Sequence, residues 1–401
     1  MQDAKRQLQI LQYGTTEITP LDEFQKMLAN SLDKNQPLRV KCGIDPTRAD
    51  VHVGHLVPYR KMRAFQDLGH QGVVIIGDYT ASIGDPTGKN EARPPLSSDE
   101  IKKNAERYME QIFTVLDPKK TEVRYQSEWF SKVGLSDIIS WAAQTTVAKL
   151  ISHDTFKQRL ENNLPLSLHE MFYPVLQGID SVYVNADVEL GGSDQKFNVL
   201  MGRDYQKARG KRPQIAMLLP IILGIDGVQK MSKSLGNYIG ILDVAFDKFG
   251  KVMSIPDKLM PEYYQYVANS TQEEVEKIKQ LLASGELHPN EAKKQLATKV
   301  VSIFHGDSEG AAMRGQFEAV FAKGQLPDEV PEFKFTRNEQ LIAILVDAKM
   351  LPSKSEGRRL IAQGGASLMD GDKITDVEIR LDESYAGKVL KIGKRKFLKL
   401  V

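Results

Sequence analysis

The sequence contains a single cysteine, Cys42, among its 401 residues. One thiol excludes an internal disulfide and is typical of a reducing compartment, so we expect a cytoplasmic protein. No run of about 18 apolar residues occurs, and this absence predicts that no helix spans a membrane. The first residues, MQDAKRQLQI, lack the apolar core of a secretory signal, so we do not expect secretion.

The composition is that of an ordinary globular protein, with 41% hydrophobic and 26% charged residues. A chain of 401 residues is too long for one compact core, so we expect two or three domains. The net charge of +2 favours no class of partner, but the segment 388–401 has six basic residues and no acidic one. This segment is typical of a nucleic-acid contact and equally of a solvated basic edge strand, and charge alone leaves both interpretations open.

Short apolar runs alternate with helical patterns through the first half of the chain. A strand at 38–44, a helix at 54–68 and an apolar strand at 73–77 form a βαβ unit. Further strands are predicted at 121–125, 188–191 and 215–218. We therefore predict an α/β fold with a doubly wound, parallel, Rossmann-like sheet, whose ligands bind at the carboxyl ends of its strands.

We divide the chain by its changes of pattern. Residues 1–244 are predicted to form a catalytic domain, with a helical lead-in over 1–35 and a helical insertion over 128–185 suited to a dimer contact. Residues 245–325 are helical and rich in charge, 326–336 form a linker, and 337–401 form a small α+β unit.

Two histidines stand three residues apart at the predicted start of the first helix, in the sequence HVGH. This spacing puts the imidazoles of His52 and His55 on one side, where they supply positive charge and hydrogen-bond donors to a polyphosphate. Gly54 has no side chain and lets a flat ring such as adenine pack on the backbone. A zinc pair is the alternative, although no cysteine or glutamate cluster nearby completes such a site.

The sequence KMSKS over 230–234 places Lys230 and Lys233 three residues apart, with Gly227 and Gly236 on either side. This pattern indicates a flexible loop that closes over a pyrophosphate. A solvated lysine loop without a ligand is the alternative.

Glycine-rich and polar turns follow the predicted strands. In GGSDQ over 191–195 the glycines let backbone amides approach a ligand, Asp194 can accept from ribose hydroxyls, and Gln195 can orient a carboxylate or phosphate. Thr47, after the first strand, either donates its hydroxyl to a phosphate or simply belongs to a turn. Tyr173, Gln177 and Asp180 share one helical stripe, which suits the wall of a polar pocket better than a core.

The sequence HVGH resembles the HIGH motif of class I aminoacyl-tRNA synthetases, and KMSKS resembles their second motif. The occurrence of GGSDQ between these two motifs adds to the resemblance. The stripe at 173–180, GGSDQ and the sequence GDPTG over 84–88 are similar to the bacterial tyrosyl-tRNA synthetases in particular. Residues 355–361 and 363–365 resemble the S4 RNA-binding domain. The resemblance covers nearly the whole chain, and the motifs occur in the same order.

The resemblance implies an enzyme that activates L-tyrosine with ATP to tyrosyl-adenylate and transfers tyrosine to the 3′ terminal ribose of tRNA(Tyr), without editing. It further implies Mg²⁺ with the ATP, no tightly bound metal, and a homodimer. The implied catalytic residues are His52, His55, Lys230, Lys233 and Thr47. The implied ATP-binding residues are Gly54, Gly192, Asp194, Met231, Ser232, Lys233 and Ser234. The implied tyrosine-binding residues are Lys41, Gly43, Asp45, Asp85, Tyr173, Gln177, Asp180 and Gln195. The implied tRNA-binding residues are Arg358, Arg359, Lys391, Lys394, Arg395 and Lys396.

Lys41 departs from the family pattern, because many members have a tyrosine there that contacts the substrate hydroxyl. Lysine only donates hydrogen bonds and an ionised Asp180 only accepts them, whereas a phenol does both. We therefore expect Lys41 and Asp180 to satisfy the phenol from two sides.

Three other functions fit part of this pattern. A tryptophanyl-tRNA synthetase shares the ATP motifs, but GGSDQ, Asp180 and the S4-like unit argue against it. A non-catalytic RNA-binding relative is disfavoured because both histidines and both lysines are intact. A general nucleotidyltransferase leaves the basic C-terminal unit unexplained.

Overall fold

A computed structural model describes residues 3–47, 50–87, 97–322, 330–351, 353–369, 371–393 and 396–401. The chain forms two compact units, the first from Met1–Asp243 and Ser254–Leu296 and the second from Val244–Met253 and Ala297–Val401. The division into domains at 244, 325 and 336 stays a prediction.

The first unit is built on a six-stranded sheet in the order β1-β6-β5-β2-β3-β4. The strands are β1 (Glu17–Thr19), β2 (Arg39–Ile44), β3 (Gln71–Ile76), β4 (Thr121–Tyr125), β5 (Val188–Gly192) and β6 (Ile215–Leu219). All neighbours pair in parallel except β1, which is antiparallel to β6. The chain runs outward from β2 in one direction and from β5 in the other, so the switch point between these two strands marks the expected ligand site.

Burial on both sides explains why the central strands are apolar. Every residue of β6 is buried, and β3 is buried from Gly72 to Ile76. Val73 and Ile75 belong to the same core cluster as Val175 and Ile179 of helix α10 (Tyr173–Tyr183). Continuous apolar runs of this kind are typical of parallel strands covered by helices on both faces, and the predicted doubly wound α/β fold is confirmed.

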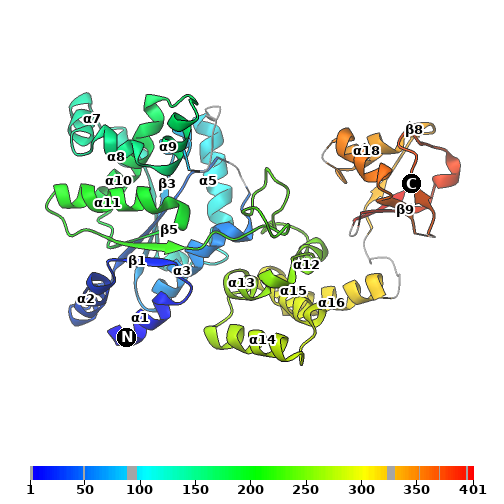
Figure 1. Cartoon of the computed structure of the whole chain (residues 1–401), viewed down its shortest axis with the longest axis horizontal. Coiled ribbons are helices and arrows are strands. Elements are labelled where there is room, and N and C mark those ends of the chain that lie inside the picture. Colours follow the sequence, from blue (N-terminus) through cyan, green and yellow to red (C-terminus); the bar gives the residue numbers. More distant parts are fainter. Residues whose placement is uncertain are drawn as a thin grey trace. The chain divides into compact units, whose positions relative to one another are not determined.

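Helices surround this sheet, as Figure 1 shows for α3, α5, α10 and α11. Before β5 they are α1 (Ala4–Gln12), α2 (Leu21–Asp33), the 3-10 turn η1 (Val53–His55), α3 (Leu56–Asp67), α4 (Thr80–Ile83), α5 (Ser98–Ile112), η2 (Pro118–Lys120) and α6 (Ser127–Phe130). The insertion then contributes α7 (Leu135–Ala142), α8 (Val147–Ile151), α9 (Asp154–Glu161), η3 (Leu168–Phe172) and α10 (Tyr173–Tyr183). After β5 come η4 (Ser193–Gln195) and α11 (Lys196–Ala208).

The N-terminal segment differs in part from the predicted helical lead-in. Strand β1 lies between α1 and α2 and pairs with β6 through Glu17↔Leu218 and Thr19↔Ala216. Three residues are too few to show an alternating pattern, so only the pairing with β6 makes this segment a strand.

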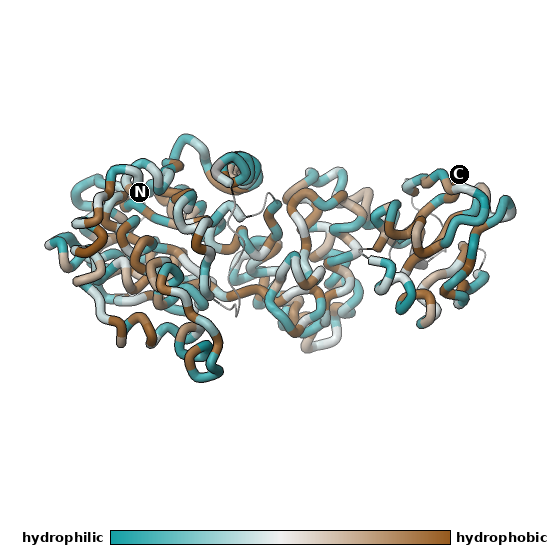
Figure 2. Tube along the Cα trace, turned by 90° about the horizontal axis from the view of Figure 1, so that it is seen from above, coloured by the Kyte–Doolittle hydropathy of each residue, from teal (hydrophilic) through white to brown (hydrophobic). Residues whose placement is uncertain are grey.

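The helical part that follows contains α12 (Ala245–Met253), η5 (Asp257–Leu259), α13 (Met260–Glu262), the π-helical η6 (Tyr263–Val267), α14 (Gln272–Ser284), α15 (Pro289–His305) and α16 (Asp307–Ala322). Helix α14 begins with a capping box, in which Thr271 and Glu274 satisfy each other's backbone N–H groups. Figure 2 shows the chain changing repeatedly between hydrophilic and hydrophobic colours along its course.

The end of the chain forms a small α+β structure. A five-stranded sheet has the order β10-β9-β12-β13-β7, and β11 pairs with β8. Its elements are β7 (Glu332–Phe333), β8 (Glu339–Gln340), α17 (Leu341–Asp347), α18 (Lys354–Ala362), β9 (Ala366–Leu368), β10 (Lys373–Ile374), β11 (Arg380–Leu381), η7 (Glu383–Tyr385), β12 (Val389–Ile392) and β13 (Lys396–Leu400). Because β7 pairs with β13, residues 332–333 are a strand rather than part of the predicted linker. In the described part of the chain, no helix is both long and apolar enough to span a bilayer.

Candidate active site

A cavity of about 490 Å³ opens at the carboxyl ends of the strands of the first unit. Of the residues predicted to bind ATP or tyrosine or to act in catalysis, it is lined by Gly43, Asp45, Thr47, His52, Gly54, His55, Asp85, Tyr173, Gln177, Asp180, Gly192, Asp194, Gln195, Lys230, Met231, Ser232, Lys233 and Ser234. Only Lys41 of that set does not line it. Segments distant in the sequence therefore meet at one site.

The rings of His52 and His55 stack face to face directly before the N-terminus of α3. Their ring centroids lie 3.6 Å apart with 21° between the planes, and stacked rings do not direct two nitrogens at one metal ion. The backbone N–H of His52 donates to Nδ1 of His55 over 3.3 Å, which leaves the proton of a neutral His55 ring on Nε2. An added Cβ at Gly54 would lie 3.1 Å from Nδ1 of His52, so glycine is what allows this close approach.

Both imidazoles are neutral near pH 7. Desolvation, followed by repulsion from His55 and from the two lysines, lowers the pKa of His52 to about 2. Desolvation and the charges of Lys233 and Lys230 lower the pKa of His55 to about 4. The expectation that these rings supply positive charge is therefore wrong, because the lysines and the enclosing protein disfavour the protonated form. They can supply hydrogen bonds.

The lysines of the KMSKS segment bring the positive charge. Lys230 Nζ lies 3.4 Å from Asp194 Oδ2, and Lys233 Nζ lies 2.8 Å from Asp50 Oδ2. Nζ of Lys233 also lies over the ring of Tyr238, 5.5 Å from its centroid. Both ammonium groups thus stand at the cavity wall, each beside a carboxylate.

The buried amide of Asn237 shapes this loop. Its Oδ1 accepts from the backbone N–H of Ser232 over 2.8 Å, and its Nδ2 donates to Asp226 Oδ2 over 2.7 Å. Leu223 and Lys230 form a β-bridge at the base. These bonds fix the position from which Lys230 and Lys233 extend.

At the end of β5, the turn into α11 connects Asp194 and Gln195 to the rest of the cavity. Gln195 Nε2 donates to Asp85 Oδ2 over 2.7 Å, and Asn198 Nδ2 donates to Gln195 Oε1 over 3.0 Å. An added Cβ at Gly192 would lie 2.6 Å from Asp194 Oδ1, so a larger residue there would displace the Asp194 carboxylate. Desolvation raises the pKa of Asp85, while hydrogen bonds from Thr87 and Gln195 oppose the rise.

Asp180 forms the buried end of the cavity. Its carboxylate accepts from Gln126 Nε2 over 2.7 Å and from Trp129 Nε1 over 3.1 Å. Desolvation raises its pKa to about 7, although Lys41 and these two donors favour the ionised form. A carboxylate offers about four acceptor positions, so one more donor can be bound there.

Tyr173 lies one helical turn before Gln177 and two before Asp180. Its hydroxyl donates to Asp45 Oδ2 over 2.8 Å, and Thr80 Oγ1 donates to Asp45 Oδ1 over 2.7 Å. Burial, followed by the charges of Asp45 and Asp85, raises the pKa of Tyr173 well above its usual value. The phenol therefore stays protonated as a donor.

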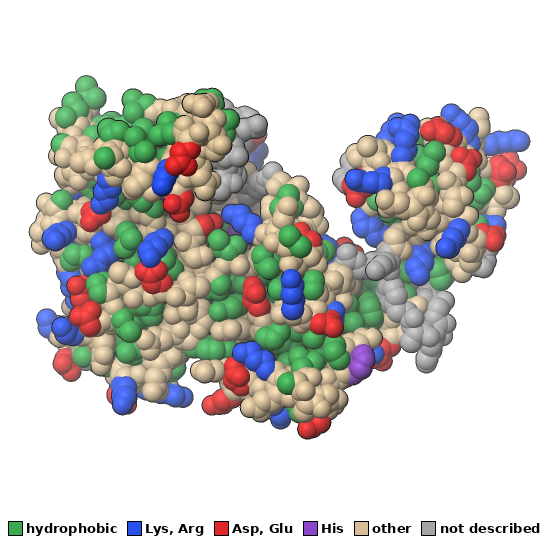
Figure 3. All heavy atoms as spheres, in the orientation of Figure 1, with side chains coloured by type: hydrophobic (Ala, Val, Ile, Leu, Met, Phe, Trp, Pro, Cys, Tyr) green, Lys and Arg blue, Asp and Glu red, His purple; other side chains and the backbone are tan. Residues whose placement is uncertain are grey.

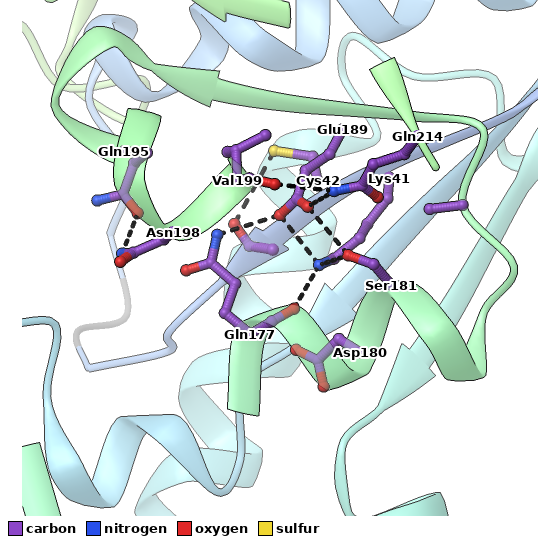
Figure 4. Close-up of polar contacts among 12 residues, drawn as sticks. Lys41, Cys42, Gln177, Asp180, Ser181, Glu189, Gln195, Asn198, Val199 and Gln214 are labelled. Carbon is purple, nitrogen blue, oxygen red and sulfur yellow. Dashed lines mark hydrogen bonds and ion pairs between the residues drawn. The ribbon is translucent and has the colours of Figure 1, made fainter. Parts of the chain in front are cut away.

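Lys41 does not point into the cavity, which corrects the expectation that it meets a substrate hydroxyl. Its Nζ donates to Gln177 O over 2.8 Å and to Ser181 Oγ over 2.7 Å, and lies 3.0 Å from Glu189 Oε1. Its side chain is completely buried. The physical reason is its depth in the strand. Lys41 shares a face of β2 with Gly43 and Asp45, which line the cavity nearer the carboxyl end. At its deeper position the ammonium group is held by Glu189 and by Gln177 and Ser181 of α10 (Figure 4).

Sequence reasoning missed three residues that hold the carboxylates of this site: Gln126, Trp129 and Thr80. Gln126 directly follows β4, so its position at the carboxyl end of a strand was a usable signal. Trp129 contacts Asp180, and Thr80 of α4 contacts Asp45, only in the folded structure. No local sequence pattern indicates either contact.

The second unit has a separate concavity, lined among others by Arg359 and Lys391. Arg358 lies 3.5 Å from Glu378, and Lys396 donates to the carbonyl of Met350 over 2.5 Å. Lys394 and Arg395 lie outside the described residues. The predicted tRNA contacts thus include two basic residues at one hollow and two on other parts of the surface.

Two family models together match residues 33–400 of the chain. The family model for class I tRNA synthetases (W and Y) matches residues 33–322, and the model for the tyrosine–tRNA ligase SYY-like C-terminal domain matches residues 322–400. A "Tyrosine--tRNA ligase" from Moorella thermoacetica is 49% identical over 400 residues, covering 100% of this chain and 96% of that protein. One from Oleidesulfovibrio alaskensis is 46% identical over 402 residues, covering 100% and 99%.

Solved structures support the fold. The tyrosyl-tRNA synthetase of Archaeoglobus fulgidus, complexed with L-tyrosine, has a TM-score of 0.63 at 20% identity and covers 78% of this chain and 100% of that one. The tyrosyl-tRNA synthetase of Aeropyrum pernix has a TM-score of 0.62 at 21% identity, with 81% and 100% covered.

Proposed function

Because the chain belongs to the class I tRNA synthetases, in the family of the tyrosine–tRNA ligases, we propose that it activates L-tyrosine with ATP to tyrosyl-adenylate and passes the tyrosyl group to the 3′ terminal ribose of tRNA(Tyr). The observation that carries this proposal is the cavity itself. A buried acceptor, Asp180, lies at one end, and two lysines and two histidines stand at the other.

The buried end suits a phenol. Asp180, already held by Gln126 and Trp129, accepts the hydroxyl of tyrosine, and phenylalanine would leave this carboxylate without that partner. Tyr173, Asp85 and Gln177 line the wall and bind the α-ammonium group. Gly43, Asp45 and Gln195 complete the tyrosine site.

In the first step, an oxygen of the tyrosine carboxylate forms a bond to the α-phosphorus of ATP, while the bond between that phosphorus and the bridging oxygen of the β-phosphate breaks. Pyrophosphate leaves with the electron pair. The carboxylate is already a nucleophile, so no general base is needed, and catalysis comes from positioning and from stabilising the added charge.

The cavity residues divide this work between hydrogen bonds and charge. The neutral His55 donates from Nε2, and His52 and Thr47 act beside it on the α-phosphate. Lys230 and Lys233 exchange their carboxylate partners for the leaving pyrophosphate, and Mg²⁺ enters with the triphosphate as part of the substrate. Asp194 binds the ribose, while Gly54, Gly192, Met231, Ser232 and Ser234 pack around the nucleotide.

In the second step, a hydroxyl of the terminal ribose of tRNA attacks the tyrosyl carbonyl and AMP leaves. We propose that the C-terminal unit holds the tRNA through Arg358, Arg359, Lys391, Lys394, Arg395 and Lys396. Figure 3 shows Lys and Arg side chains spread over this unit. The reaction needs no editing site, because the buried acceptor for the phenol selects the substrate. We expect it in the cytoplasm, where tRNA is used.

We further propose a homodimer formed through the helical insertion. Large apolar side chains there are exposed, including Leu135 at 73%, Val147 at 65% and Leu168 at 72%. Figure 3 shows hydrophobic side chains gathered over the lobe that carries α7 and α8, at the upper left. Exposed apolar clusters of this kind mark contact surfaces.

Amino-acid-dependent exchange of pyrophosphate into ATP tests the proposal, run with tyrosine, phenylalanine and tryptophan in parallel. Exchange with tyrosine alone is expected. Exchange with tryptophan instead would keep the chemistry at the histidines and lysines and overturn the pocket assignment. Folded protein that exchanges with none of the three would refute the activation chemistry and favour an RNA-binding protein without catalysis.

A further inference from the structure

A buried ion pair lies directly behind the proposed tyrosine pocket. Lys41 of β2 and Glu189 of β5 are register partners on neighbouring parallel strands. Their side chains are 0% and 1% exposed, and Nζ lies 3.0 Å from Oε1. Two charges held this far from water are stable only when surrounding groups satisfy their hydrogen bonds.

The network of the pair is complete on the lysine side. An ammonium group has three N–H donors. Lys41 directs them at Gln177 O, Ser181 Oγ and Glu189 Oε1, as Figure 4 shows. No donor of Lys41 is left for a substrate.

The carboxylate of Glu189 accepts from three side chains besides Lys41. Ser181 Oγ donates to Oε2 over 3.0 Å, and Gln214 Nε2 donates to the same oxygen. Gln177 Nε2 donates to Oε1 over 3.1 Å. Since a carboxylate without a proton cannot donate, the group that faces it from Gln177 must be the amide nitrogen.

Gln177 is therefore held at two points, its backbone carbonyl by Lys41 and its amide nitrogen by Glu189. With the nitrogen turned to Glu189, the amide oxygen turns the other way, and Figure 4 shows it directed away from the network. Gln177 also lines the cavity. The side chain thus has its acceptor oxygen available to whatever binds beside it.

We propose that Glu189, neutralised by Lys41, is a positioning residue that fixes the amide orientation of Gln177 and so selects a substrate with a cationic α-ammonium group. This inference rests on the proposed function, in which Gln177 meets the ammonium of tyrosine. The charge of Glu189 is essential to it: a neutral amide at 189 could donate or accept and would allow Gln177 to flip. Lys41 is required because it is the buried counter-ion of this carboxylate, and an unpaired buried charge is strongly disfavoured.

The test compares ligands with and without the ammonium group. The double variant Lys41→Met/Glu189→Gln removes both charges together and avoids leaving one unpaired. Its affinity and that of the wild type are measured by calorimetry for L-tyrosine, for tyramine and for 3-(4-hydroxyphenyl)propionate, which lacks the amine. We expect a loss of roughly ten- to a hundredfold for tyrosine and tyramine, the effect of one hydrogen bond to a charged group. The propionate should change by less than about twofold, within the usual spread for a site that is not coupled.

A matched control is the buried pair Arg159 and Glu170 of the insertion, whose side chains are 4% and 5% exposed. The variant Arg159→Met/Glu170→Gln also removes a buried ion pair, but one without a contact to Gln177, so its selectivity should equal that of the wild type. If Lys41→Met/Glu189→Gln does not fold, the same three affinities are measured with Glu189→Asp. This variant keeps the negative charge but moves the carboxylate oxygen away from Gln177. A selective loss for the ammonium ligands supports the inference.

Equal losses for all three ligands would show that the pair only supports the structure, and would overturn the inference. Failure of the wild type to bind tyrosine at all would count against the proposed function itself. The two failures are distinguishable, because the first is seen in the variants and the second in the unaltered protein.

Discussion

Lys230 and Asp194 come from two separate segments and meet at the cavity, with Nζ 3.4 Å from Oδ2. Their side chains are 53% and 26% exposed, and ion pairs with such access to water contribute at most about 1 kcal/mol. The pair is therefore easily broken. In the proposed reaction ATP replaces it, because its ribose binds Asp194 while its phosphates bind Lys230.

This arrangement predicts that Asp194→Asn impairs the use of ATP more than that of tyrosine. The variant loses an acceptor for the ribose, which is expected to raise KM for ATP about tenfold, the effect of one hydrogen bond. The dissociation constant of tyrosine should not change. Asp50→Asn is the control, since it removes the partner of Lys233 and leaves the ribose site intact. An unchanged KM for ATP in Asp194→Asn would contradict the assignment.

The two histidines are expected to act as neutral donors. His52→Ala or His55→Ala should slow adenylate formation by about 10²- to 10³-fold, as loss of one donor to a developing charge does, with normal tyrosine binding. Their pKa values of about 2 and about 4 leave both rings uncharged above pH 5. The ratio of wild-type to variant rate should therefore be constant from pH 6 to 8 in single-turnover experiments. A ratio that falls as the pH rises through 6.5 would indicate charged imidazoles.

Asp180 predicts a pH dependence of tyrosine binding. Its pKa is raised to about 7, so the free protein carries the ionised acceptor above that pH and the neutral acid below it. Affinity for tyrosine should rise between pH 5.5 and 7 by roughly tenfold per unit and then level off.

Calorimetry at several pH values measures this dependence, with Asp180→Asn as the control. The asparagine amide does not titrate in this pH range, so its weaker binding of tyrosine should be independent of pH. A wild-type profile that is flat down to pH 5.5 would mean that the carboxyl does not receive the phenol in its ionised form.

The exposed apolar residues of the insertion predict the oligomeric state. Leu135→Asp and Leu168→Asp place charges on side chains that are 73% and 72% exposed, so folding of the chain should be unaffected while a dimer through this surface should dissociate. Light scattering after size exclusion gives the mass. Leu242→Asp, at a position 69% exposed elsewhere in the chain, should leave the dimer intact. A monomeric wild type would refute the dimer.

The basic hollow of the second unit predicts a salt-dependent contact with tRNA. Arg359→Ala and Lys391→Ala should each weaken tRNA binding. Each should also reduce, by about 1, the steepness with which the logarithm of the tRNA association constant falls with the logarithm of salt concentration. Pyrophosphate exchange should not change. Arg337→Ala is the control, because its exposed guanidinium pairs with Glu383 and does not line the hollow. Equal salt slopes in all three variants would remove the hollow from the tRNA site.

Local pattern was sufficient for five of the six strands in the sheet of the first unit. The strand β4 has the predicted limits Thr121–Tyr125, and β5 and β6 extend one residue beyond theirs. Continuous apolar runs between helical patterns indicate parallel strands because both faces of such a sheet are covered. Strand β1 escaped prediction because its three residues become a strand only by pairing with β6.

In the candidate site, too, some features followed from local sequence and others depended on tertiary contacts. Motif residues from HVGH, GGSDQ and KMSKS line one cavity, as expected from strands whose carboxyl ends meet. The charge of the histidines was predicted wrongly, because desolvation and nearby lysines act through space and leave no trace in the local sequence.

The sequence by itself determined the fold class, the family and the residue types gathered for phosphate and phenol chemistry, because periodicity and motif spacing are local properties. Only the tertiary structure decided which way each side chain points. Lys41 faces α10 and pairs with Glu189, its register partner on a strand far away in the chain, instead of entering the cavity. A buried ammonium group is stable only beside an opposite charge, and the pairing of β2 with β5 places Glu189 beside Lys41.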